Sequence, residues 1–143
     1  MTETSQSIEQ RLRSLGHRLV EREGAEAPHR EEANRVASRL HGRVERALAA
    51  YHEAVSSVSS LRVSLSEPRL DDKHLHAIEF DLERGRHRAI ITVKQRGEVT
   101  LVGPFRQGKS EGPCRSFPFT AEDEIEQALG DFLCRFVEAA VTP

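Results

Sequence analysis

Residues 76–102 read HAIEFDLERGRHRAIITVKQRGEVTLV, and this stretch decides the fold. Its first part alternates between apolar and polar residues, which is the two-residue period of a half-buried strand. The pair Arg84-Gly85 predicts a tight two-residue turn, and the apolar positions resume after it as far as Val93. The stretch therefore predicts an antiparallel β-hairpin with one face turned toward a core.

Charge favours one register for this hairpin. A turn at residues 84–85 places Asp81 opposite Arg88 and Glu83 opposite Arg86. Opposite charges that face each other across two strands stabilise the pairing. The apolar pattern and the charge pattern thus predict the same hairpin independently.

Further strands extend the hairpin in both directions. Arg96-Gly97 predicts a second turn before residues 98–102, where both faces carry apolar residues, as in a central strand. Residues 113–119 predict an edge strand, because their two prolines cannot donate to a ladder. Residues 61–65 alternate as a first strand. We predict a four- to five-stranded antiparallel β-meander over about residues 61–119.

The amino-terminal third predicts a helical hairpin over about residues 7–59. Apolar residues recur at helical spacing in a first segment, at Ile8, Leu12, Leu15 and Leu19, and again from Ala33 to Val58. Gly24 is a residue that ends helices and Pro28 is one that opens them, so a turn is expected between the two segments. A second helix of about 30 residues would be about 45 Å long.

The carboxy-terminal segment predicts an amphipathic helix over about residues 121–140, packed on the sheet. Thr120 with Asp123 predicts an amino-terminal cap. The apolar positions form one broad face: Ile125, Leu129, Phe132, Leu133, Phe136, Val137 and Ala140. Helices and antiparallel strands thus occupy separate parts of the chain, which predicts a single α+β domain over residues 1–143.

Composition excludes several classes of protein. The 143 residues carry 21 basic and 23 acidic side chains, so the net charge of −2 predicts neither a nucleic-acid nor a membrane partner. Two cysteines are too few for a disulfide framework. The first residues are polar rather than those of a signal peptide, and no apolar run reaches the ~20 residues of a membrane span. We expect a cytoplasmic protein with reduced thiols.

Residues 103–110, GPFRQGKS, match the phosphate-binding pattern G-x-x-x-x-G-K-[ST]. In nucleotide-binding proteins a helix begins at the lysine and points its amino end at the phosphates. Here Gly112 and Pro113 follow almost at once, and a proline there would break the first turns of a helix. The match is therefore interpreted as a β-hairpin loop that carries Lys109, without a nucleotide-binding role.

Basic residues gather between residues 84 and 115, where eight lysines and arginines face two glutamates. This segregation makes an anion- or nucleic-acid-binding surface the alternative function, with these candidate residues: Arg88, Lys94, Arg96, Arg106 and Lys109. The competing interpretation is that acidic neighbours neutralise the surface and that basic edges protect the sheet from aggregation. No series of aromatic residues supports base stacking.

Neither metal binding nor catalysis is predicted. His74 and His76 share a strand face, but a metal site needs a third ligand and the sequence supplies no recognised spacing. Cys134 lies on the apolar side of the last helix, where a buried thiol is expected. No paired base identifies a nucleophile. We therefore expect no catalytic residue, no metal and no cofactor.

The second predicted helix is longer than its hairpin partner, so part of its apolar face needs another cover. Ala33, Ala37 and Ala47 would allow a close approach of a second helix. We predict a homodimer, joined along this helix or through the sheet edge. The function expected from these features is that of a non-enzymatic interaction protein, which means an adaptor, a chaperone-like protein or a regulatory subunit.

Overall fold

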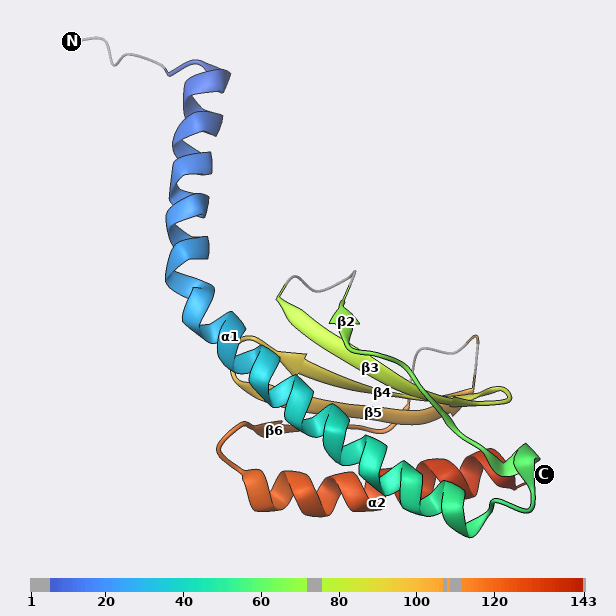
Figure 1. Cartoon of the computed structure of the whole chain (residues 1–143). Helices are drawn as coiled ribbons and strands as arrows, with labels where there is room; N and C mark the ends of the chain where they lie inside the picture. The colour runs from blue at the N-terminus through green and yellow to red at the C-terminus, as the bar shows by residue number, and fades with distance from the viewer. Residues whose placement is uncertain (1–5, 72–75, 107, 109–111, 143) are drawn as a thin grey trace.

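The computed structural model describes residues 6–71, 76–106, 108 and 112–142. A long helix comes first, then an antiparallel sheet, then a second helix (Figure 1). The elements are α1 (Ile8–Ala54), the 3-10 turn η1 (Ser59–Leu61), β1 (Ser64–Leu65), β2 (Arg69–Leu70), β3 (Ala77–Arg84), β4 (His87–Lys94), β5 (Glu98–Arg106), β6 (Cys114–Pro118) and α2 (Glu122–Val141). The predicted α+β class is confirmed.

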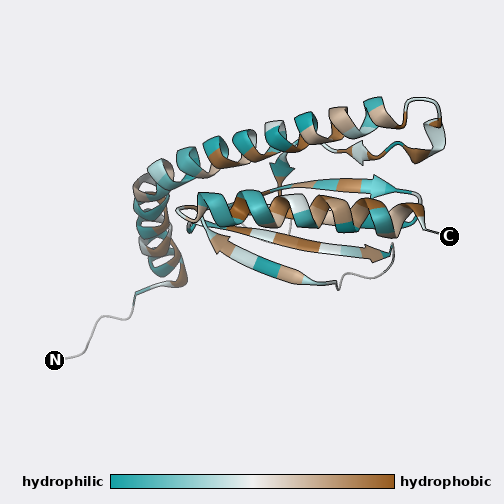
Figure 2. Ribbon diagram, turned by 90° about the horizontal axis from the view of Figure 1, so that it is seen from below, coloured by the Kyte–Doolittle hydropathy of each residue, from teal (hydrophilic) through white to brown (hydrophobic). Residues whose placement is uncertain are grey.

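The sheet has the spatial order β1-β3-β4-β5-β6, and β2 pairs with β3 on the same side as β1. All of these pairs are antiparallel. The predicted meander is therefore confirmed from β3 to β6. Both α1 and α2 lie on one face of this sheet (Figures 1 and 2), so neither helix covers the opposite face.

The predicted register of the central hairpin is wrong by two residues. Glu83 lies opposite Arg88, and Arg84 lies opposite His87, so the turn consists of Gly85 and Arg86. Gly85 has φ 58°, a conformation that glycine adopts without steric cost. Two-residue turns accept glycine in either the first or the second position. The sequence alone therefore does not distinguish a turn at residues 84–85 from one at residues 85–86.

One continuous helix, α1, replaces the predicted helical hairpin. It begins with a capping box, in which the Ser7 hydroxyl accepts from the Gln10 amide and the Gln10 side chain accepts from the Ser7 amide. Pro28 lies inside the helix rather than at its start. Figure 1 shows the helix changing direction in this region, so that its first turns project away from the sheet.

The bend in α1 has a local cause and local stabilisation. Pro28 has no N–H to donate, and its ring crowds the carbonyl group of Gly24, so the helix kinks there. The Arg30 guanidinium spans the bend, because it pairs with the Glu23 carboxylate and donates to the Glu23 carbonyl oxygen at 3.1 Å. Glu23 also contacts His76, and Glu26 accepts from Gln95, at the end of the sheet. These contacts favour a continuous helix where the sequence predicted a turn.

A single hydrophobic core lies between the two helices and the sheet. Helix α1 contributes from Ala33 onward, and its core residues are Ala33, Val36, Ala37, Leu40, Val44 and Leu48. Phe80 at the centre of β3 and Phe136 on α2 are the largest fully buried side chains. The predicted packing of the last helix on the sheet is thus confirmed.

Two details of the carboxy-terminal helix differ from prediction. Thr120 does not cap it, because α2 begins after Ala121, whose amide donates to the Pro118 carbonyl at 3.0 Å in a preceding turn. Cys134 is exposed, since it lies beyond the edge of the apolar face. Among the described residues, no helix is both long enough and apolar enough to cross a bilayer.

Strand β5 contains a position that only glycine fits. Gly103 has φ 120°, beside the register shift of the β4–β5 ladder. A Cβ atom there would lie 3.0 Å from the Ala89 Cα atom and 3.1 Å from the Arg88 carbonyl oxygen. Both the backbone conformation and the space therefore require glycine.

We expect Gly103→Ala to lower the free energy of unfolding by about 2–4 kcal/mol, because it combines backbone strain with a clash against backbone atoms. Gly130→Ala is the matched control, since Gly130 is exposed on α2 with nothing within 4 Å of the added Cβ. The control should raise stability by up to about 1 kcal/mol. Urea denaturation measures both, and equal effects would contradict this account of β5.

Candidate functional site

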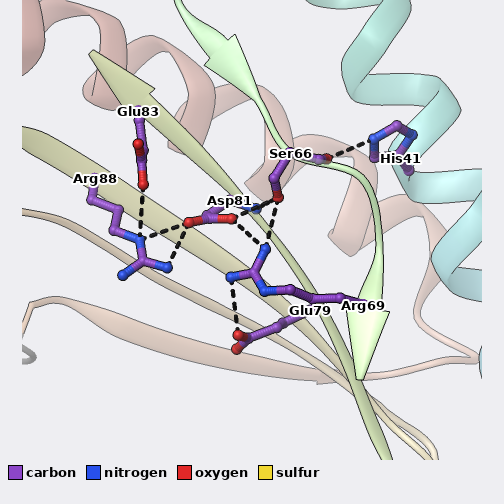
Figure 3. Close-up of polar contacts among 7 residues, drawn as sticks. All are labelled: His41, Ser66, Arg69, Glu79, Asp81, Glu83 and Arg88. Carbon is purple, nitrogen blue, oxygen red and sulfur yellow. Dashed lines mark hydrogen bonds and ion pairs between the residues drawn. The ribbon is translucent and has the colours of Figure 1, made fainter. Parts of the chain in front are cut away.

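The open face of the sheet carries an ion-pair network centred on Asp81. Its members come from three strands and the segment between β1 and β2: Ser66, Arg69, Glu79, Asp81, Glu83 and Arg88 (Figure 3). Asp81 is only 4% exposed although it points away from the hydrophobic core. A carboxylate this buried needs paired charges and hydrogen bonds.

Three side chains satisfy the two carboxylate oxygens of Asp81. Oδ1 accepts from the Arg69 guanidinium at 2.7 Å and from the Ser66 hydroxyl at 2.6 Å. Oδ2 accepts from the Arg88 guanidinium at 2.7 Å. The Ser66 hydroxyl in turn accepts from the Asp81 amide at 2.9 Å. The network therefore ties the β1–β2 edge to β3 and β4.

This network has the electrostatics of a structural site. Burial raises the pKa of Asp81, but hydrogen bonds from Arg69, Ser66 and Arg88 together outweigh it and hold the pKa below its usual value. Such a carboxylate stays ionised at neutral pH, and its two oxygens already accept hydrogen bonds from three side chains. General acid–base catalysis by Asp81 is therefore unfavourable.

Glu79 has the opposite shift. Burial and the nearby charge of Asp71 raise the pKa of Glu79, and Arg69, whose guanidinium lies 3.0 Å away, offsets this only in part. The pKa of Arg69 is raised, mainly by its hydrogen bond to Asp81 and to a smaller extent by Glu79. Asp81 is therefore the preferred partner of Arg69, with Glu79 at the margin of the network.

His41 joins this network to the hydrophobic core. Its Nε2–H group donates to the Ser66 carbonyl oxygen at 2.9 Å, and its ring meets Phe80 edge-on at a centroid distance of 5.0 Å. His41 lies on α1, so the helix, the β1–β2 segment and the centre of β3 meet at this point (Figure 3).

The predicted anion-binding residues that the structure describes lie at two ends of the sheet, with Arg88 and Arg106 at one end and Lys94 and Arg96 at the other. Arg88 is engaged with Asp81 and Glu83 at one end of β4. At the other end Glu98 pairs with both Lys94 and Arg96, and the hydrogen bond from Arg96 is the main cause of the lowered pKa of Glu98.

The remaining two candidates are Arg106 and Lys109. Arg106 is exposed at the end of β5 and makes no ion pair with any acidic residue in the described part of the chain. Lys109 lies outside the described residues. The four candidates that the structure describes are thus not gathered into one patch.

The phosphate-binding pattern begins inside a strand. Residues 103–106 belong to β5, and the next described element, β6, pairs with β5 antiparallel. A phosphate-binding loop instead joins a strand to a helix. The prediction that this stretch turns back as antiparallel strand agrees with β5 and β6, and residues 107 and 109–111 lie outside the description.

The histidines and cysteines weighed as metal ligands or nucleophiles form no common site among the described residues. His76 Nε2 lies 3.0 Å from a Glu23 carboxylate oxygen on α1, whereas His74 lies outside the described residues. Cys114 and Cys134 are both exposed and unpaired with each other. No group of three or more potential metal ligands occurs within residues 6–71, 76–106, 108 and 112–142.

The projecting part of α1 has the most unusual surface of the described chain. We call residues 8–22 the arm. Its apolar stripe is largely exposed, at 70% for Ile8, 62% for Leu12, 42% for Leu15 and 43% for Leu19. Figure 1 shows the arm standing clear of the sheet and of α2. Scattered exposed apolar residues are common in proteins, but a regular stripe along one helix face is typical of an interaction surface.

A hollow of about 600 Å³ lies where the arm meets the sheet, and we call it the crook. Residues from α1 and from the ends of β3 and β4 line it, including Leu19, Glu23, Glu26, His76, Ala77 and Gln95. Gln95 is buried and donates to the Glu26 carboxylate at 3.1 Å, and Glu23 contacts His76. The stripe therefore runs from the free end of the arm into the crook.

Comparison with protein-family models, with curated proteins and with solved structures found no match to this chain. A function is therefore inferred from the surfaces described above.

Sequence reasoning found part of these surfaces. The stripe of Ile8, Leu12, Leu15 and Leu19 was predicted, but as the inner face of a hairpin. Arg69 was missed, because its contact with Asp81 depends on a pairing of β2 with β3 that nothing in the short β2 segment signals. The crook was missed because it exists only if α1 continues through Pro28.

The lowered pKa of Asp81 gives a prediction for stability against pH. Asp81 contributes stability that is complete above its unfolded-state pKa of about 3.9 and is lost as the pH falls through the lower folded-state value. Asp81→Asn should lower the free energy of unfolding by about 3 kcal/mol at neutral pH and should remove this acid-dependent loss.

Glu83→Gln is the control for this experiment, because Glu83 is 60% exposed and lies 3.5 Å from the same Arg88. It should change stability by less than about 1 kcal/mol. Urea titrations between pH 2 and pH 7 test both variants. A pH dependence that Asp81→Asn leaves unchanged would show that Asp81 does not stabilise the fold in this way.

Proposed function

We propose that the protein is a non-enzymatic interaction protein that acts as a homodimer, with the arm as its contact surface. The observation that supports the proposal is the exposed stripe of Ile8, Leu12, Leu15 and Leu19. Positions at steps of four, three and four form the narrow seam by which two helices pack in a coiled coil. A partner helix on this seam would remove all four side chains from water.

Helix energetics support the same function. Isolated helices of about 12–15 residues are only marginally stable in water, and most helical stability in proteins comes from packing of an apolar face. The arm continues into the rest of α1, but among the described residues its seam packs on nothing beyond the crook. Burial of an apolar side chain contributes roughly 1.5–3 kcal/mol, so a second helix would stabilise the arm as well as bind it.

The arm replaces the dimer surface that the sequence suggested. Of the three alanines that were expected to admit a second helix, Ala33 and Ala37 are 1% and 2% exposed within the core of their own chain, whereas Ala47 is partly exposed. Ala33 and Ala37 therefore offer no surface to another molecule. A contact through the arm keeps the predicted homodimer and moves it toward the amino end of the same helix.

Anion or nucleic-acid binding has less support as an alternative. Among its described candidates, Arg88, Lys94 and Arg96 each lie within 3.5 Å of a carboxylate. An anion would have to compete with those carboxylates for each cation. Among the described residues, the exposed Arg106 has no such competing carboxylate, and one arginine is a weak electrostatic attraction at physiological salt.

The proposal is tested by the mass of the protein in solution. We expect a dimer at micromolar concentration, and we expect Leu15→Glu to raise the dimer dissociation constant at least 100-fold, because it places a charge in the middle of the seam. His17→Glu is the matched control, since His17 is exposed on the opposite side of the arm. It should leave the dimer intact.

Sedimentation equilibrium measures both variants, and circular dichroism shows whether each one is folded. A wild-type protein that stays monomeric at 100 μM would contradict the proposal. So would a dimer that Leu15→Glu leaves unchanged, since another surface would then hold the two copies together.

A further inference from the structure

We infer that the outer edge of β6 binds an extended, basic segment of a partner protein, which adds to the sheet as an antiparallel strand. The inference concerns a surface far from the arm in the chain and does not depend on the homodimer. It follows from the backbone groups that β6 presents, from the groove between β6 and α2, and from the charge of that groove.

Strand β6 presents unpaired backbone groups at the edge of the sheet. It ends the strand order, so within the described part of the chain no strand lies beyond it (Figure 1). The Gly103 amide donates to the Pro113 carbonyl oxygen at 2.8 Å, and the register continues from there along β6. Because antiparallel pairs alternate between bonded and non-bonded positions, Cys114 and Ser116 point their N–H and C=O groups away from β5.

The opposite edge of the sheet is a poorer template for a further strand. There β1 and β2 have two residues each, and Pro68 lies between them. Short strands and prolines are common protections against strand addition. In β6 the prolines lie only at the two ends, at Pro113 and Pro118, which leaves a short stretch centred on Arg115 open to pairing.

A groove of about 390 Å³ lies between β6 and α2. On the β6 side it is lined by Arg115 and Phe117. Its α2 side carries three acidic side chains: Asp123, Glu124 and Asp131. Successive side chains of a strand point to opposite faces, so every second side chain of an added strand would enter this groove. Strand addition of this kind takes affinity from the backbone and specificity from alternate side chains.

The acidic side chains of the groove differ from those on the other flank of α2. On that flank Glu122 pairs with Arg39 and Glu126 pairs with Arg43. The three groove acids make no ion pair with any basic residue in the part of the chain that the structure describes. Negative charge in the first turn of a helix has a structural role, but Asp131 lies beyond that turn.

The one basic side chain in the lining leaves these carboxylates unneutralised. The Arg115 guanidinium lies over the Phe117 ring, 4.9 Å from its centroid. Lysine or arginine side chains from an added strand would meet the free carboxylates, and charge complementarity of this kind sets the choice of partner. The groove therefore favours a segment with basic residues at alternate positions.

Charge disfavours the other occupants of this edge. A second copy paired through β6 would bring its own α2 alongside, and α2 carries six acidic residues against one arginine. Nucleic acid would meet the same negative charge. A basic extended segment satisfies both the backbone edge and the groove.

The first test uses a synthetic peptide, acetyl-(Lys-Thr)4-amide, with a fluorescent label. Fluorescence anisotropy with the full chain should give a dissociation constant of about 100 μM or lower in 50 mM NaCl. The charge-reversed peptide acetyl-(Glu-Thr)4-amide should not bind. Absence of binding by the lysine peptide at 1 mM would overturn the inference.

Methylation of the peptide backbone tests the antiparallel ladder. Residues opposite Cys114 and Ser116 would turn their N–H groups toward β6 and their side chains toward the open face, so these residues are threonines when the lysines enter the groove. N-methylation of the threonines should weaken binding at least about tenfold, whereas N-methylation of the lysines should change it less than about threefold. Equal effects, or the reverse order, would overturn the inference.

A matched pair of variants tests the edge from the side of the protein. Ser116→Pro removes an outward N–H group without removing a bond to β5, and prolines are tolerated at such edge positions. It should weaken binding at least about tenfold. Ser116→Ala is the control, because it loses the same hydroxyl contact with Thr100 and keeps the N–H group. Its binding should stay within about twofold of wild type.

A second pair tests the charge of the groove. Asp131→Lys should weaken binding of the lysine peptide about threefold to tenfold in 50 mM NaCl. Glu138→Lys makes the same charge change on α2 outside the groove and should have less than half of this effect. Equal weakening by the two variants would show general attraction to an acidic protein and would overturn the inference.

Circular dichroism shows whether each variant is folded, and sedimentation equilibrium shows its mass. If Ser116→Pro dissociates a dimer, the edge of β6 holds a second copy and the inference is wrong. The homodimer through the arm is tested separately by Leu15→Glu, so either proposal can fail while the other stands.

Discussion

Helix α1 is much longer than the sheet it packs on, and the other features of the molecule depend on this mismatch. Its 47 residues span about 70 Å, whereas strands of eight or nine residues span about 30 Å. The sheet therefore covers α1 only from Ala33 onward. The bend at Pro28 directs the excess length away from the sheet, and the apolar stripe of the arm is largely uncovered by the part of the chain that the structure describes.

The open face of the sheet shows how the protein uses its charges. Arginines that the sequence presents as a basic surface lie against carboxylates of the same chain: Arg88 with Asp81 and Glu83, and Arg96 with Glu98. The ion pairs of the buried Asp81 favour one arrangement of strands, because a shifted register would leave this carboxylate without partners. The polar face thus helps to specify the fold, whereas the apolar arm is the surface that we propose for association.

The sequence predicted element types well and their connections less well. Alternation of apolar residues identified β3 and β4, but a glycine such as Gly85 suits either position of a two-residue turn, so the register was displaced by two. Gly24 and Pro28 favour a helix end locally, and contacts distant in sequence, such as Glu26 with Gln95, decide for a continuous helix. The Asp81 network required β2, whose two residues carry no pattern.

The bend also divides the chain by its folding behaviour. No residue of the arm contributes a side chain to the hydrophobic core, and the contacts near Glu23 and Glu26 are polar. Cooperative unfolding units follow shared burial, so we expect the unit that contains the sheet to end near residue 28. Residues of the arm can then be substituted during evolution without loss of stability in the rest of the domain. A new specificity for association would therefore need no new fold.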